Sequence, residues 1–363
     1  MDPQTVLVTG PTGALGGRMI ATLLERTNVR VLALVRAASV QEGMRRIRAA
    51  VGPHASERDI AARVEAIPGD LRKPPWEHDA KLFERMHREV TMIIHMAAAT
   101  DLFGERDKVM AINVGGTERI ISLAKSLQKD GRFQRLAHFS TAFVVGSSRG
   151  RTSEETYPCP DPAWANAYEE SKYIAEGLVH DAAADGLPTI VFRPSIVVGD
   201  SQTGAISSFG IFYHMVRRVK RSVRYSGLRF IPGRPDDRLQ IVPIDFVCEA
   251  TVAISRDSRA SGRIFHLSSD NPPTIASLLE VGGRTYDWIA VLRPVDPAKI
   301  STLAAFVPEA ERLLPTMGYL SSGLVFDTSN TREILRNTAV PMPDTGEVFV
   351  EKLVNFVEEV EYA

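Results

Sequence analysis

The sequence has 363 residues, about twice the usual length of one domain, which predicts one large α/β domain with a smaller part appended. Hydrophobic residues make up 44% and charged residues 24% of the chain, which excludes a disordered, collagen-like or coiled-coil protein. The formal net charge of −1 gives no reason to expect a nucleic-acid partner. Cys159 and Cys248 lie far apart and form no CxxC pair, which argues against a disulfide framework or a zinc site.

The start of the chain resembles neither a signal peptide nor a membrane anchor. No basic segment and no small-residue cleavage site precede the apolar run Thr5–Val8, so we expect no secretory signal. The longest apolar runs, such as Met92–Ala99, have the length of a buried strand and fall short of the roughly 18 to 20 residues that span a bilayer. We therefore expect no membrane span and a cytoplasmic location.

Short β-branched runs alternate with longer segments of helical period along the first half of the chain. The expected strands are Thr5–Thr9, Arg30–Val35, Val64–Ile67, Thr91–His95, Arg135–Ser140 and Pro188–Arg193. The expected helices are Ala14–Arg26, Val40–Val51, Asp107–Lys129 and Asn166–Ala184. Strands that are apolar throughout are typical of a parallel sheet covered by helices on both faces. With right-handed crossovers, this pattern predicts a doubly wound α/β Rossmann fold.

The alternation stops after about Gly199, and the stretch Phe209–Arg238 is basic and irregular. Later segments with features of a helix or a strand are Pro243–Ile254, Arg263–Leu267 and Pro273–Leu279. We therefore expect a Rossmann domain over residues 1–205. A smaller C-terminal α/β substrate-binding lobe, over residues 206–363, is expected to interleave with the last strands of the sheet.

Glycines at the spacing GxxGxxG follow the first expected strand and open the first expected helix. The loop consists of Thr9, Gly10, Pro11, Thr12, Gly13, Ala14, Leu15 and Gly16. Glycine allows a tight turn and lets the backbone approach a pyrophosphate, while the helix N-terminus supplies free N–H groups and a partial positive charge. Between a strand and a helix at the start of a βαβ chain, this loop predicts a dinucleotide-binding site rather than ordinary turns.

The end of the second expected strand indicates which dinucleotide binds. NAD-binding folds place an acid there to meet the ribose 2′-hydroxyl, whereas this chain has Arg36, which could pair with a 2′-phosphate. Arg46 on the next helix, with Arg45 and Arg48 beside it, could add a second contact. Asp70 could accept a hydrogen bond from the adenine amino group, or be a turn aspartate. The sequence thus favours NADPH over NADH.

Tyr168 and Lys172 lie four residues apart, so both project from one face of a helix. An ammonium beside a phenol stabilises the phenolate and lowers the pKa of the phenol from about 10, so Tyr168 is expected to act as a proton donor or acceptor. Lys172 could also hold the nicotinamide ribose. The pair occurs on many half-buried helix faces, but its position after a dinucleotide loop favours catalysis. Thr141 at a strand end could donate to the same substrate oxygen, with Ser140 as the alternative donor.

These residues resemble an extended short-chain dehydrogenase/reductase, and within it the fatty acyl-CoA reductase or thioester reductase group. That group includes terminal reductase domains of carboxylic acid reductases and nonribosomal peptide synthetases. The resemblance runs from Val6 to about Leu267, with further markers at Gly69–Leu71, His95–Ala98, Asn113–Thr117, Phe192–Ser195, Gly199–Gly204 and Val242–Asp245. Met96 stands where the family often has Asn. Since no adenylation or carrier domain is present, we expect the activated substrate to come from elsewhere, or the chain to be excised from a larger enzyme.

The resemblance implies a catalytic triad of Thr141, Tyr168 and Lys172. Besides the glycine loop, it implies cofactor contacts from Arg36, Arg46, Asp70, Leu71, Ala97, Asn113, Lys172, Arg193 and Ser195. The implied reaction is the NADPH-dependent reduction of an acyl thioester, carried by coenzyme A or by an acyl or peptidyl carrier protein, to an aldehyde. The pro-S hydride of NADPH would attack the carbonyl and Tyr168 would supply the proton. Further reduction to an alcohol stays open.

A local excess of positive charge lies in His214–Arg238. Eight basic residues, Arg217, Arg218, Lys220, Arg221, Arg224, Arg229, Arg234 and Arg238, stand against two acidic ones, Asp236 and Asp237. The excess could bind the phosphates of coenzyme A, or the phosphopantetheine and acidic surface of a carrier protein. It could equally be a solvated helix face.

Two other functions stay open. An extended epimerase, dehydratase or ketone reductase acting on a nucleotide sugar or another carbonyl would use the same Tyr/Lys chemistry, and tightly retained NAD would favour it. A sensor or scaffold that binds the cofactor without catalysis is the third function, and the intact triad argues against it. The sequence has no HExxH motif and its eight histidines are scattered, so we expect neither a metal site nor a hydrolase. His95 and His266 are expected to be structural.

Overall fold

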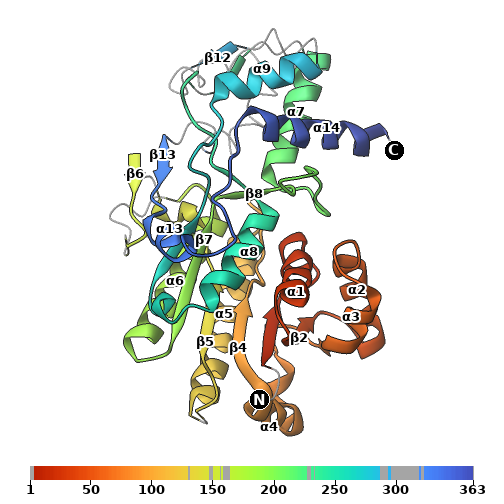
Figure 1. The fold of residues 1–363 in the computed structure, drawn as a ribbon, viewed down its shortest axis with the longest axis vertical. Coiled ribbons are helices and arrows are strands. Elements are labelled where there is room, and N and C mark those ends of the chain that lie inside the picture. The colour runs from red at the N-terminus through yellow and green to blue at the C-terminus, as the bar shows by residue number, and fades with distance from the viewer. Residues whose placement is uncertain are drawn as a thin grey trace.

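The computed structural model describes residues 4–129, 131–146, 150–155, 157, 164–226, 230–232, 234–286, 293–295, 319 and 323–362. Within them the main feature is a seven-stranded sheet in the order β11-β7-β5-β4-β1-β2-β3 (Figure 1). Its strands are β1 (Thr5–Thr9), β2 (Arg30–Val35), β3 (Val64–Pro68), β4 (Val90–His95), β5 (Arg135–Phe139), β7 (Thr189–Pro194) and β11 (Ile264–Leu267). Every pairing is parallel, and the chain order reverses between β1 and β4. The expected Rossmann fold is thus confirmed.

Helices cover both faces of the sheet, and each face has its own hydrophobic core. One face carries α1 (Ala14–Arg26), α2 (Val40–Val51), α3 (Glu57–Arg63), α8 (Ile244–Ser255) and α13 (Ser329–Leu335). The other carries α4 (Ala80–Glu89), α5 (Arg106–Gln128) and α6 (Ala167–Ala184). Leu7 and Val8, neighbours in β1, are both fully buried but belong to different cores. Because successive strand residues point to opposite faces, a sheet covered on both sides requires continuous apolar strands.

A smaller lobe contains the rest of the described chain. Its helices are α7 (Ile211–Ser226), α9 (Ile275–Thr285) and α14 (Glu347–Tyr362), which gather at the top of Figure 1. Three parallel strand pairs accompany them: β8 (Ile196–Val198) with β10 (Ile241–Pro243), β9 (Phe230–Pro232) with β12 (Arg293–Val295), and β6 (Gly150–Thr152) with β13 (Leu324–Phe326). The chain returns to the large sheet through α8 and β11, so lobe and sheet interleave. A domain boundary at residue 205 stays a prediction.

Five of the described helices differ from the sequence-based expectation. No helix was predicted at α3, α4, α13 or α14, and α7 occupies a stretch predicted to be irregular. Both α3 and α4 are short and bury a single side chain each, Ile60 and Met86 respectively, so few apolar residues mark them in the sequence. In α7, Phe212, Tyr213 and Met215 are buried in the core of the lobe. The basic residues that follow them interrupt the apolar pattern, so the helix was not predicted from the sequence.

None of the helices that the structure describes combines the length and the apolar character that crossing a bilayer requires.

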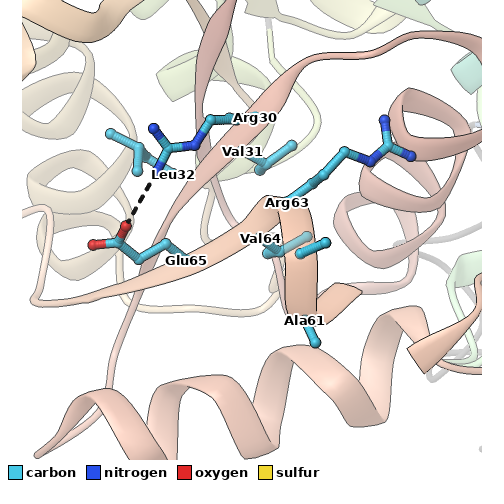
Figure 2. A pocket seen from close by; sticks show the side chains of 8 residues that line it. Arg30, Val31, Leu32, Ala61, Arg63, Val64 and Glu65 are labelled. Carbon is cyan, nitrogen blue, oxygen red and sulfur yellow. Dashed lines mark ion pairs between the residues drawn. The ribbon is translucent and has the colours of Figure 1, made fainter. Parts of the chain in front are cut away.

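A pocket of about 240 Å³ lies where β2 and β3 begin, at the edge opposite their carboxyl ends (Figure 2). Its charged side chains already have partners within the protein. Arg30 forms an ion pair of 3.9 Å with Glu65, and Arg63 donates to the carbonyls of Leu24 and Thr27. Those carbonyls lie at the C-terminal end of α1, so Arg63 caps that helix. We assign no ligand to this pocket.

Arg193 of β7 and Glu176 of α6 form an ion pair with both side chains 0% exposed. The Arg193 Nε atom lies 3.1 Å from each carboxylate oxygen. Burial by itself would raise the pKa of Glu176, but the charge and hydrogen bonds of Arg193 hold it below its usual range. Both side chains are therefore ionised, and their ion pair links α6 to β7 of the sheet.

Replacing Glu176 with Gln should lower the free energy of unfolding by about 3 to 5 kcal/mol, because the buried Arg193 guanidinium would lose the carboxylate that neutralises its charge. Urea denaturation measures the change. The matched control is Glu249→Gln, which breaks an ion pair to Arg26, whose side chain is 52% exposed, and should cost no more than about 1 kcal/mol. Equal losses in the two variants would contradict this role of the buried pair.

Candidate active site

The loops that follow β1 to β5 meet at one edge of the sheet, because all these strands are parallel. The chain order reverses at that edge between β1 and β4, which is where doubly wound folds bind their ligands. Most of the residues singled out in the sequence lie on these loops or on the helices that follow them. The structure therefore brings the glycine loop, the basic end of β2 and the Tyr168 helix to one side of the molecule.

The glycine loop forms a cradle at the N-terminus of α1. Gly10 has a φ of +73°, and a Cβ there would lie 3.0 Å from the backbone of Ala97. A Cβ on Gly16 would lie 2.0 Å from the Gly10 carbonyl oxygen, so a side chain does not fit. Gly13 begins the helix without a side-chain cap, and the first turn contains no acidic residue. The first-turn N–H groups and the helix dipole therefore face outward, as an anion site requires.

Thr9, the last residue of β1, connects the glycine loop to the end of β4 through hydrogen bonds. Its side chain is buried, and its hydroxyl accepts hydrogen bonds from the N–H groups of Met96 and Ala97 at 3.2 and 3.1 Å. The same hydroxyl lies 2.8 Å from Nδ1 of His95, and burial lowers the pKa of His95 to about 3. Thr9 therefore joins the ends of β1 and β4, which positions the loop. Thr12, Ala14 and Leu15 lie half-buried along the cradle.

The end of β2 is basic, as expected. Arg36 is exposed there, and the Arg46 guanidinium donates to the Arg36 carbonyl, which brings the two residues together. The Asp70 carboxylate is held by Arg72 at 2.7 Å. The hydrogen bond from Arg72 lowers the pKa of Asp70, and nearby Arg36 adds to the effect. The sequence reasoning missed Arg72, although a cation two residues after the aspartate is visible in the sequence.

Two residues that were expected to contact the cofactor, Leu71 and Asn113, are buried and make contacts within the protein. The Leu71 side chain is buried against α5, 2.7 Å from where a Cβ on Gly116 would lie. Asn113 is also buried, and its amide bonds the backbone N–H and carbonyl of Ala99 at 2.7 and 3.0 Å. It also donates to the Ser171 hydroxyl at 2.8 Å. Asn113 thus ties the loop after β4 to α6, and its side chain is fully engaged in that role.

The structure does not bring the side chain of Arg193 to the nucleotide edge. That side chain is 0% exposed and is bound to Glu176, because a buried guanidinium needs a buried carboxylate as its partner. The expected cofactor contact from the Arg193 side chain is therefore replaced by a structural ion pair. Ser195 is buried just after β7, and its N–H donates to the Leu267 carbonyl at 3.0 Å.

Thr141, Tyr168 and Lys172 come from two segments in contact, the turn after β5 and the start of α6. Lys172 is buried, and its Nζ donates to the carbonyl of Phe139, the last residue of β5. Thr141 begins a 3₁₀ helix (Ala142–Val145), and its hydroxyl accepts from the Phe143 N–H at 3.3 Å. Tyr168 is half-buried in the first turn of α6. The lysine therefore fastens the helix that carries Tyr168 to the strand end that carries Thr141.

The structure does not give Tyr168 the lowered pKa that the sequence predicted. Burial raises the pKa of Tyr168 to about 12, and the neighbouring Glu169 carboxylate adds to the rise. Burial also lowers the pKa of Lys172 to about 8, against the opposing charge of Glu176. Burial of the phenol thus outweighs the stabilisation of the phenolate that the Lys172 ammonium offers. Tyr168 therefore keeps its proton at neutral pH.

The basic segment is partly engaged within the lobe. Lys220 of α7 forms an ion pair with Glu358 of α14, and the Arg217 guanidinium lies 4.3 Å from the centre of the Phe209 ring. The side chain of Arg238 donates to the Pro272 carbonyl at 2.8 Å. The side chains of Arg218, Arg221, Arg224 and Arg229 lie outside the described residues, as does Cys159. Phosphate binding by this segment stays a prediction.

Comparison with known proteins agrees with this geometry. A family model described as male sterility protein matches residues 8–251, more than half of the chain. Glycine betaine reductase ATRR of Emericella nidulans is 26% identical over 94% of this chain and 28% of its own length. L-2-aminoadipate reductase of Schizosaccharomyces pombe is 26% identical over 93% of this chain and 25% of its own length. The chain thus spans less than a third of either relative.

Among solved structures, the terminal R domain from the myxalamid PKS-NRPS biosynthetic pathway matches with a TM-score of 0.84 and 27% identity. The match covers 99% of this chain and 92% of that domain, and so extends over both the Rossmann sheet and the C-terminal lobe. The chain belongs to the male sterility protein family, in the thioester reductase group of the extended short-chain dehydrogenase/reductases.

Proposed function

We propose that this chain reduces an acyl thioester to an aldehyde with NADPH, with the acyl group carried by coenzyme A or by a carrier protein. The observation that carries the proposal is that the uncapped glycine cradle and the Tyr168–Lys172 face of α6 meet at one sheet edge. The two relatives named reductases and the matched terminal R domain support the reaction class. The R domain of a PKS-NRPS pathway also supports a carrier protein as the partner.

The residues at this edge fit a dinucleotide. The uncapped N-terminus of α1 offers N–H groups to a pyrophosphate. The glycine loop can pack closely against this helix because Gly16 has no side chain, whose Cβ would lie 2.0 Å from the Gly10 carbonyl oxygen. Arg36 and Arg46 supply positive charge for a 2′-phosphate. When bound, the nicotinamide supplies the hydride.

The protein's own task is to manage the proton and the charge on the substrate oxygen. Tyr168 is protonated at neutral pH because burial raises its pKa to about 12, so it can give its proton to the developing alkoxide. The Thr141 hydroxyl donates a second hydrogen bond to that oxygen. The Lys172 ammonium stabilises the phenolate that remains. Collapse of the resulting hemithioacetal breaks the carbon–sulfur bond and releases the aldehyde and a thiol.

The direct test follows NADPH absorbance with a panel of acyl-CoA, acyl-carrier, aldehyde and ketone substrates. We expect oxidation of NADPH with a thioester and formation of one aldehyde for each NADPH consumed. Turnover of ketones or nucleotide sugars without any turnover of thioesters would contradict the proposed substrate class.

Replacing Tyr168 with Phe should lower kcat at least about 100-fold, because the alkoxide would lose its proton donor. NADPH binding should stay unchanged, since the cradle lies on α1. Steady-state kinetics and a fluorescence titration with NADPH measure the two effects. Tyr173→Phe on the same helix is the matched control and should keep full activity. Wild-type turnover by the Tyr168 variant would refute its assignment.

Replacing Arg36 with Ala should weaken NADPH binding roughly 10-fold or more, which corresponds to a lost charged hydrogen bond of about 1.5 to 3 kcal/mol. NADH binding should not change, because NADH has no 2′-phosphate. Isothermal titration with both nucleotides makes the comparison. Arg58→Ala removes another exposed cation, from α3, and serves as the control. A parallel loss of affinity for both nucleotides would contradict the assignment.

The pH profile of kcat/KM should fall above about pH 8. Burial lowers the pKa of Lys172 to about 8, so its ammonium is present below that pH and is lost above it. The neutral amine no longer stabilises the Tyr168 phenolate. In Lys172→Arg the guanidinium keeps its charge, so the alkaline fall should disappear whatever the absolute rate. A wild-type profile that stays flat to about pH 10, near the usual lysine pKa, would count against this role.

A further inference from the structure

We propose that Tyr319, a residue of the C-terminal lobe, is a positioning residue that holds Tyr168 in place relative to Thr141. The inference rests on the proposed function, because it assumes that Tyr168 and Thr141 act on one substrate oxygen. It goes beyond that function by making the lobe part of the catalytic geometry, in addition to any role in binding substrate.

The Tyr319 hydroxyl binds the first turn of α6 on both sides of Tyr168. It donates to Oε1 of Glu169 and accepts from Nδ2 of Asn166 at 3.1 Å. Asn166 is the residue at which α6 begins, and its side-chain oxygen accepts from the Glu169 N–H at 3.0 Å. The other oxygen of Glu169 accepts from the Ala165 N–H at 3.0 Å. One phenol thus closes a ring of hydrogen bonds around the turn that carries Tyr168.

The ring of Tyr319 contacts the segment that carries Thr141. Phe143 lies edge-on to Tyr319, with 4.9 Å between the ring centres. The N–H of the same Phe143 donates to the Thr141 hydroxyl at 3.3 Å. A single side chain therefore touches both segments that supply the expected oxygen ligands, the 3₁₀ turn through its ring and α6 through its hydroxyl.

Because the hydrogen bond between Tyr319 and Glu169 is buried, losing it is costly. Glu169 and Tyr319 are 4% and 7% exposed, so loss of the phenol hydroxyl would leave a buried carboxylate oxygen without its donor. The first turn of α6 would have to shift to restore a partner. A shift of about 1 Å in a reacting group can slow a reaction roughly 100-fold.

The test is Tyr319→Phe, which keeps the ring against Phe143 and removes only the hydroxyl. We expect kcat to fall roughly 10- to 100-fold while the KM for the thioester and the Kd for NADPH stay unchanged. Tyr213→Phe is the matched control. It removes a fully buried hydroxyl from the same lobe core, where it accepts from the Gly199 N–H at 2.8 Å, and it should leave kcat unchanged.

A double variant distinguishes an effect of Tyr319 on the position of Tyr168 from a general loss of stability. In a Tyr168→Phe background, Tyr319→Phe should cause no further loss of residual activity, because its effect acts through the missing phenol. Full kcat in the single variant, a change confined to KM, or an additive loss in the double variant would overturn the inference.

Hydrogen exchange separates a failure of the inference from a failure of the proposed function. Amides in the first turn of α6 should exchange faster in Tyr319→Phe than in wild type, and not in Tyr213→Phe. If wild type reduces no thioester, the proposed function fails, and this exchange result alone decides whether Tyr319 holds the turn. Unchanged exchange would overturn the inference in that case too.

Discussion

The uniform direction of the seven described sheet strands is the constraint on which the rest of the structure depends. Because the strands are parallel, every loop that follows a strand opens at the same edge, and the reversal between β1 and β4 leaves room there for a ligand. The uncapped N-terminus of α1 contributes positive potential to that edge. Residues more than 130 positions apart, such as Arg36 and Tyr168, thereby come to lie on one side of the protein.

Buried polar contacts hold α6, which carries Tyr168 and Lys172, in a fixed position relative to the sheet. Lys172 binds the carbonyl at the end of β5, and one turn further along α6 Glu176 binds Arg193 of β7. The same helix is therefore attached to two neighbouring strands by charged groups. Because charges without partners are costly inside a protein, these contacts specify one position of the helix. They explain why the side chain of the family marker Arg193 is buried against Glu176.

Much of the fold and part of the site could be predicted from the sequence. The bounds of β1, α1, β2 and α2 match the predicted ranges, because short apolar runs alternate there with segments of helical period. The glycine loop and the Tyr168–Lys172 pair are local in sequence, so their spacing alone revealed them. The partners of Lys172 and Arg193 could not be predicted, since each depends on a contact between separate elements. Tyr319 lies 150 residues from Glu169, and no local pattern links the two.

A crystal structure with NADP⁺ bound tests the central claim most directly. The account predicts the pyrophosphate over the Gly10–Gly16 loop, the 2′-phosphate beside Arg36, and the nicotinamide ring facing Tyr168 and Lys172. A nucleotide bound elsewhere, or in the cradle with both of these side chains turned away from the ring, would contradict it.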